Sequence, residues 1–314
     1  MVKKSQWTNQ GRRFIVLVES GNARASFCPD LGSCTIDAVA NALTADLFPS
    51  DINGHFKRWY QNGKCVYENE HPDWTGFLSY PKKPDIKSVP KNSSSNWRHL
   101  DFLWERTTSV GLDLPTWFAM GAEPPKNRIM IVSQDPLRRK LPGGQLHLSS
   151  PFGFHDGEYA SSVTGVVLKA ILQLLENNAS VYLTDAMKLY FAFGNQSSCL
   201  KCRQAYLSTA FDWKASFRKV VDREIELFNP TLVVLMDNSV IEIMLDRFNS
   251  RSFNAEKIRL LTANHKPIPT EARSFEIKGR TYKFLPIWHL TSARVRLSNE
   301  QKVESFANAI RGAC

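Results

Sequence analysis

Acidic and imidazole side chains follow three short apolar runs in the second half of the chain. Asp135, Asp185 and His289 each stand within two residues of the end of such a run. A carboxylate can orient a water molecule or stabilise developing positive charge, and an imidazole can donate a hydrogen bond to a leaving group. These three residues are therefore candidates for hydrolytic chemistry, although a histidine after a strand is also commonly structural.

The segment after Asp135 combines cations, glycines and aromatic rings. Its residues of interest are Leu137, Arg138, Arg139, Lys140, Gly143, Gly144, Phe152 and Phe154. Adjacent glycines let the backbone approach a ligand closely, and a run of cations can contact phosphates. Each feature alone is also typical of an ordinary turn or hinge. Together they make this segment a candidate binding loop, with an ordinary turn as the alternative.

The apolar runs predict strands that alternate with helices. Strands are expected at 128–133, 181–184, 231–236 and 284–288, and helices at 163–175, 217–228, from 238, and at 299–310. This order is typical of an α/β fold in which a central parallel twisted sheet is flanked by helices on both faces. Ligands of such sheets bind beyond the carboxyl ends of the strands, where Gln134 and the three candidate residues are expected.

The chain divides into two parts on this interpretation. Residues 121–314 are predicted to form the α/β domain, and residues 1–120 an N-terminal extension or cap of unknown role. A proline- and serine-rich stretch at 81–96 is expected to be a linker or a long surface loop. Aromatic and basic residues in the extension could contact nucleic acid or form a structural cap.

The charge balance indicates a polyanionic partner. The chain carries 40 Lys and Arg against 30 Asp and Glu, a net charge of +10, and most of the excess lies after residue 127. A basic protein that is merely soluble is the alternative. With 43% hydrophobic and 22% charged residues, disordered and fibrous classes are excluded. The apolar runs are too short to span a membrane, and no secretory signal is readable, so we expect a cytoplasmic monomer.

Four segments in this order resemble the uracil-DNA glycosylase superfamily. The segments are Gln134-Asp135-Pro136 with the Pro-Gly-Gly-Gln-Leu-His stretch at 142–147, Leu183 to Lys188, Asn229-Pro230 with the run at 232–236, and Leu285 to Arg294. The resemblance covers about residues 125–312, and in character it is similar to anti-phage members that act on hypermodified cytosine. It implies the uracil-DNA glycosylase-like form of the α/β fold.

The resemblance also implies roles for individual residues. Asp135 would position the attacking water and stabilise an oxocarbenium-like sugar, and His289 would donate a hydrogen bond to the base O2. Phe152 or Phe154 would stack on the flipped base, with Phe152 preferred from its spacing, and Gln134 would help to bind it. The expected DNA contacts are Arg138, Arg139, Lys140, Gly143, Gly144, Ser292, Arg294 and Arg296.

The wedge residue is different in this chain. Relatives place a leucine in the gap that the flipped base leaves, and here Ala293 falls near that position. Arg294 could fill the gap or simply contact phosphates.

Two further departures from the family bear on the substrate. The family reads uracil with an asparagine, and Asp185 stands at that position; a carboxylate accepts from the exocyclic amine of cytosine. Leu137 replaces an aromatic residue that shields C5 in several relatives, so a C5 substituent could be admitted. Asp185 could instead handle water or act as a structural cap.

We therefore expect a monofunctional DNA glycosylase that excises hydroxymethyl- or glucosylated-type cytosine from DNA, such as phage DNA, and leaves an abasic site. The alternatives are a repair glycosylase for uracil or another deaminated base, and a non-catalytic reader of modified DNA. Lys188 could form a Schiff base, but an ion pair or a phosphate contact is the expected role.

No cofactor or metal is expected, because water is the nucleophile. Cys199 and Cys202 have the spacing of a metal pair, and Cys28 and Cys34 form a distant second pair. The iron–sulfur branches of the superfamily carry a cysteine directly after the lysine of the base-reading strand, where this chain has Leu189. Free thiols are therefore expected, with zinc or an iron–sulfur cluster at Cys199 and Cys202 as the alternative.

Overall fold

The computed structural model describes about two fifths of the chain, mainly its second half. The described residues are 25–27, 41, 79–80, 109–113, 115–120, 126–134, 146–149, 151, 165–188, 190–192, 213–236, 238–244, 272–287, 289–290 and 297–314. The two parts predicted from the sequence, 1–120 and 121–314, stay a prediction.

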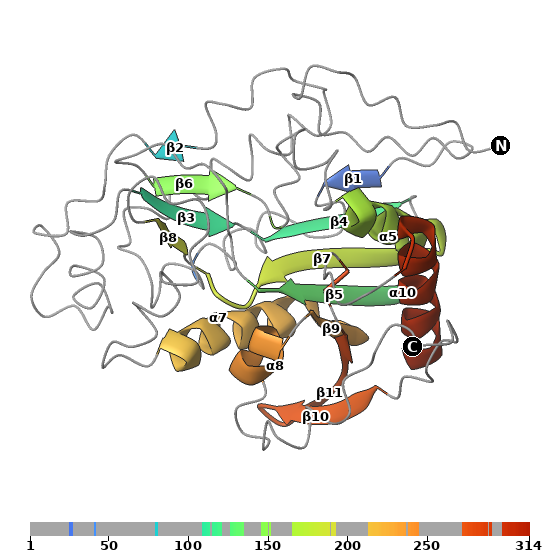
Figure 1. Ribbon diagram of the computed structural model, residues 1–314. Helices are drawn as coiled ribbons and strands as arrows, with labels where there is room; N and C mark the ends of the chain where they lie inside the picture. The colour runs from blue at the N-terminus through green and yellow to red at the C-terminus, as the bar shows by residue number, and fades with distance from the viewer. Residues whose placement is uncertain are drawn as a thin grey trace, which may run out of the picture.

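A mixed sheet forms the centre of the described structure (Figure 1). Its seven strands run in the order β1-β4-β7-β5-β9-β11-β10. Their bounds are Ala25–Phe27 (β1), Thr116–Met120 (β4), Asn127–Ser133 (β5), Ala179–Asp185 (β7), Leu232–Met236 (β9), Arg273–Ile277 (β10) and Arg280–Ile287 (β11). The four inner strands β7, β5, β9 and β11 are parallel. The α/β class is thus confirmed.

The four predicted strands are parallel, whereas the strands beside them, which were not predicted from the sequence, are antiparallel. Strand β4 pairs antiparallel with β7, and β1 with β4; at the other edge β10 pairs antiparallel with β11. β10 and β11 are joined by the two-residue turn Lys278-Gly279, in which both residues have positive φ. Such turns match the twist of a hairpin and so place the two strands side by side without a crossover helix.

A second, smaller sheet has the strand order β2-β6-β3-β8 among the described residues. Its strands are Ser79–Tyr80 (β2), Ser109–Asp113 (β3), Leu146–Ser149 (β6) and Tyr190–Ala192 (β8). Strands β3 and β4 are close in sequence but belong to different sheets. β4 lies before the predicted domain boundary, yet it extends the sheet of the α/β part.

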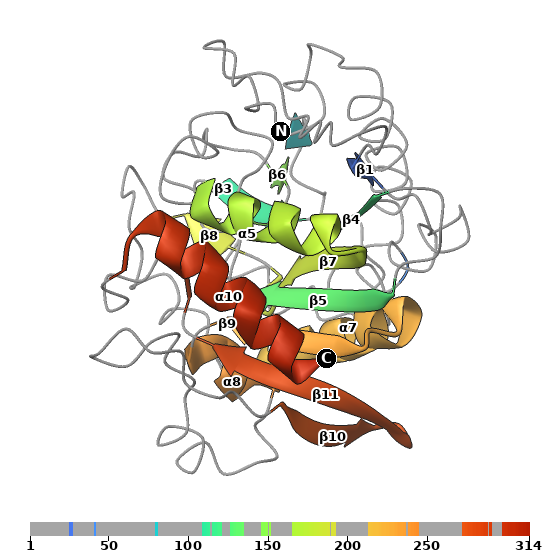
Figure 2. The same ribbon diagram turned by 90° about the vertical axis from the view of Figure 1, so that its right-hand side faces the viewer.

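Helices cover both faces of the large sheet (Figure 2). Helices α5 (Gly165–Glu176) and α10 (Asn299–Ala313) pack against each other on one face, and α7 (Trp213–Phe228) and α8 (Asn238–Met244) lie on the other. This arrangement follows from right-handed crossovers between parallel strands. The chain crosses the sheet in one direction from β5 to β7 and in the opposite direction from β7 to β9, so the connecting helices lie on opposite faces.

The core is the apolar surface between the sheet and these helices. Strands β7 and β9 are buried along their whole length, as expected for parallel strands covered on both faces. Helix α7 ends where the sequence predicts: Asn229 has a φ of 49° and its amide donates to Ile225 O at 2.8 Å, and Pro230 then prevents continuation. Helix α10 begins with a capping box between Ser298 and Gln301.

No helix among the described residues is both long and apolar enough to cross a membrane.

Candidate functional site

The carboxyl ends of the four parallel strands meet at one edge of the large sheet. Ser133 ends β5 and Asp185 ends β7, and the two residues are register partners in the parallel pairing. His289 follows β11 by two residues. The sequence therefore placed Asp185 and His289 at the correct edge of the sheet.

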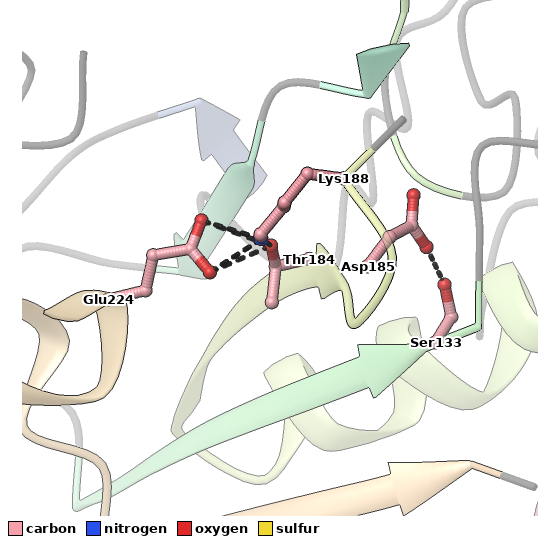
Figure 3. Close-up of polar contacts among 5 residues, drawn as sticks. All are labelled: Ser133, Thr184, Asp185, Lys188 and Glu224. Carbon is pink, nitrogen blue, oxygen red and sulfur yellow. Dashed lines mark hydrogen bonds and ion pairs between the residues drawn. The ribbon is translucent and has the colours of Figure 1, made fainter. Parts of the chain in front are cut away.

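Asp185 is buried and is held by Ser133. The side chains of both residues are almost inaccessible, with Asp185 1% and Ser133 4% exposed. The Ser133 hydroxyl donates a hydrogen bond to Asp185 Oδ1 (Figure 3). Asp185 Oδ1 therefore acts as an acceptor for Ser133 at the end of β7.

Backbone hydrogen bonds extend this pairing past the ends of the strands. Ala186 N donates to Ser133 O at 2.8 Å, and Met187 N donates to Gln134 O at 2.9 Å. The turn that carries Asp185 is thereby joined to the first residue of the Gln134-Asp135-Pro136 segment. The two candidate carboxylates thus belong to chain segments that are hydrogen-bonded to each other.

Lys188 lies on the opposite side of this turn and is fully buried. Its ammonium is 2.7 Å and 3.0 Å from the two carboxylate oxygens of Glu224 on helix α7, and it also donates to Thr184 Oγ1. Thr184 Oγ1 is itself 3.0 Å and 3.1 Å from the same two oxygens. The expected ion-pair role of Lys188 is therefore what the structure contains.

Burial raises the pKa of Glu224 above its ordinary value, because the charged carboxylate loses its hydration there. Attraction to Lys188 and hydrogen bonds from Lys188 and Thr184 act in the opposite direction but are smaller effects. Glu224 thus depends on its partners to stay ionised inside the protein.

His289 lies three strands away from Asp185. Strands β5 and β9 separate β7 from β11, so the two backbones are about 14 Å apart along the sheet at a spacing of about 4.8 Å per strand. His289 is half-buried, and Leu290 beside it is buried.

Most of the other predicted site residues lie outside the described part of the chain. These are Asp135, Leu137, Arg138, Arg139, Lys140, Gly143, Gly144, Phe152, Phe154, Ser292, Ala293, Arg294 and Arg296. The predicted loop at 81–96 lies outside the described residues too. So do the four cysteines with metal-like spacing, Cys28, Cys34, Cys199 and Cys202. Among the described residues no group of acidic, histidine or cysteine side chains could hold a metal ion.

Neither the contact between Ser133 and Asp185 nor the part played by Glu224 was predicted. Ser133 was expected among the polar residues at the strand ends, but no role was assigned to it. Glu224 was not singled out, although it occupies the apolar stripe of helix α7 together with Val221 and Ile225, and all three are buried. A single carboxylate at such a position is a readable signal, since a buried charge requires a partner.

No protein-family model matches this chain, and a search of curated proteins finds no match either.

Proposed function

We propose that the protein is a monofunctional DNA glycosylase that hydrolyses the N-glycosidic bond of C5-modified cytosine. The observation that carries the proposal is the buried Asp185, held by Ser133 at the carboxyl end of β7 and hydrogen-bonded through its turn to the segment that leads into Asp135. An acceptor at this place suits the exocyclic amine of cytosine better than the O4 of uracil.

In the proposed reaction, the modified nucleotide leaves the helix and its base binds at the carboxyl ends of the parallel strands. The bond between C1′ and the base nitrogen breaks, and its electron pair goes to the base. His289 stabilises the negative charge on the base O2 by a hydrogen bond, and Asp135 orients the water whose oxygen bonds to C1′. The water gives its hydroxyl to C1′ and its remaining proton to the base, so the products are the neutral free base and an abasic site.

Lys188 supports a hydrolytic course over a covalent one. A lysine nucleophile must present a free amine to the sugar, whereas Lys188 is fully buried and ion-paired with Glu224. No metal or cofactor takes part in the proposed reaction.

The biological setting that fits this chemistry is defence against phages whose DNA carries hydroxymethylated or glucosylated cytosine. Plain cytosine must be rejected by such an enzyme, since its excision would damage the host genome. Rejection is strong only where a polar group of the site is left unpaired without the substituent.

The test is incubation with oligonucleotides that differ at one position: cytosine, hydroxymethylcytosine, glucosylated hydroxymethylcytosine or uracil. Mass analysis of released bases should find the modified cytosines and neither plain base. Release of uracil alone would favour the repair glycosylase. Asp135→Asn should keep DNA binding and lose base release. If the unmutated protein binds modified DNA but releases no base from any of the four, it is a reader and not an enzyme.

A further inference from the structure

Glu224 is a carboxylate on a helix face that is otherwise apolar. Helix α7 buries Phe217, Val221 and Ile225 against the sheet, and Glu224 is fully buried beside them. A charge in such surroundings is stable only with well-placed partners. Its partners among the described residues, Thr184 at the end of β7 and Lys188 three residues beyond this strand, come from one short stretch of chain.

The two residues that contact Glu224 enclose the turn that carries Asp185. Thr184 immediately precedes Asp185, and Lys188 follows it by three residues; both lie against the Glu224 carboxylate, and Lys188 also donates to Thr184. Figure 3 shows Lys188 turned toward Glu224, while Asp185 is turned the other way, toward Ser133. Successive side chains of a strand alternate in direction, so Thr184 reaches the helix and Asp185 does not.

We propose that Thr184, Lys188 and Glu224 form a clamp that positions Asp185 for base recognition. This inference rests on the proposed function. The clamp closes the turn from the α7 side, and the amides of Ala186 and Met187 fix the other side to Ser133 O and Gln134 O. The turn that carries Asp185 is therefore held by Thr184 before Asp185, by Lys188 after it, and by the amides of Ala186 and Met187 between them. The three clamp residues act by fixing the position of Asp185 and do not contact the base.

The effect of the clamp on the position of the turn can be separated from its effect on the stability of the fold. A buried ion pair can often be replaced by apolar side chains of similar volume with no loss of stability. Apolar side chains, however, offer no hydrogen bonds that fix the turn at a defined place. A change of that kind should preserve the fold and release the turn.

The decisive variant is the double replacement Lys188→Met with Glu224→Leu. We expect its denaturant midpoint to match or exceed that of the unmutated protein, while kcat for release of modified cytosine falls by about a hundredfold and KM changes little, since small misplacements cost that much. The matched control is Arg218→Met with Asp222→Leu, which removes an ion pair of 3.9 Å elsewhere on α7. This control should change neither the denaturant midpoint nor kcat. A double variant that folds and keeps the unmutated kcat overturns the clamp.

A second measurement needs no substrate and so separates the clamp from the proposed function. Amide hydrogen exchange at Ala186 and Met187 should be at least about tenfold faster in the double variant, with Val234 of β9 unchanged as the reference. If exchange accelerates but even the unmutated protein releases no base, the clamp stands and the proposed function fails. Unchanged exchange at both amides overturns the clamp, whatever happens to base release.

Should the double variant not fold, Thr184→Val carries the same test. Valine has the shape of threonine and removes only the hydroxyl that contacts Glu224 and Lys188. Faster exchange at Ala186 and Met187 is the supporting result, and exchange rates equal to those of the unmutated protein overturn the proposal.

Discussion

The Ser133 hydroxyl donates a hydrogen bond to Asp185 Oδ1 across the carboxyl ends of two parallel strands, and both side chains are buried. Register alone brings them together, because Ser133 and Asp185 are the last partners in the pairing of β5 with β7. A residue that ends the first strand thereby fixes a carboxylate that ends the second.

Replacing Ser133 by alanine should weaken both the fold and base release. Loss of a hydrogen bond to a carboxylate costs about 1.5–3 kcal/mol, which urea unfolding measures. We expect kcat/KM on modified cytosine to fall at least about tenfold, because Asp185 loses the contact that orients it.

Ser180→Ala is the matched control for this change. Ser180 is buried in the neighbouring strand β7, but its hydroxyl has no hydrogen-bond partner among the described residues, so its removal should leave stability unchanged or raise it. Equal effects of the two substitutions would mean that the Ser133–Asp185 contact contributes nothing specific.

Asp185→Asn should shift base preference from cytosine toward uracil. The amide of asparagine can donate to O4 and accept from N3–H of uracil, whereas it faces the cytosine amine less favourably. A mismatched polar contact costs about 1–3 kcal/mol, so the ratio of kcat/KM between modified cytosine and uracil should fall at least about tenfold. Asp222→Asn on helix α7 is the control. An unaltered ratio would assign Asp185 a structural role instead.

Lys188 should form no covalent bond to DNA. Its ammonium is buried against Glu224, so borohydride reduction during turnover on modified DNA should trap no protein–DNA adduct. Gel analysis under denaturing conditions detects such adducts, with an enzyme known to use a lysine Schiff base as the positive control. A trapped species that disappears in Lys188→Met would contradict the hydrolytic course.

Glu226 should make stability depend on pH. Partial burial opposes its ionisation, but the ion pair with Lys278 at 2.7 Å and the hydrogen bond from Arg223 at 2.8 Å outweigh this effect and lower its pKa. The unfolded chain therefore binds the proton first as pH falls. The resulting stabilisation is present above the ordinary pKa of glutamate and is lost as pH falls through the folded value.

Glu226→Gln should accordingly lower the free energy of unfolding at about pH 7 by less than about 1 kcal/mol, because Lys278 and Arg223 are largely exposed. Urea titrations from about pH 6 down to about pH 3 should show the difference from the unmutated protein shrinking. A difference that stays constant over this range would rule out the charge as its cause.

Much of the α/β part could be predicted from the sequence because its strands are continuous apolar runs. The runs that became β5, β7 and β9 are buried on both faces, and a helix ending at Asn229-Pro230 is marked by its own residues. The end of each run then located Asp185 and His289 at one edge. Here local pattern and tertiary position agree.

The edge strands and the clamp could not be predicted in the same way. In β10, Phe275 is buried between the exposed Ser274 and Glu276, and its Lys278-Gly279 turn lacks the Asn-Gly or Asp-Gly pair that signals a hairpin. The partner of Glu224 depends on how α7 crosses the sheet, which no short sequence window contains. Contacts between residues far apart in sequence arise only from the assembled topology.

The position of β5 has a consequence for synthesis on the ribosome. β5 lies between β7 and β9, and both of these strands come later in the chain. Until residues 179–185 and 232–236 have emerged, the nascent chain carries an apolar segment, Ile129 to Val132, with two unpaired edges. Aggregation during expression should therefore be governed by this stretch, and slower growth at reduced temperature or a holdase chaperone should raise the soluble yield.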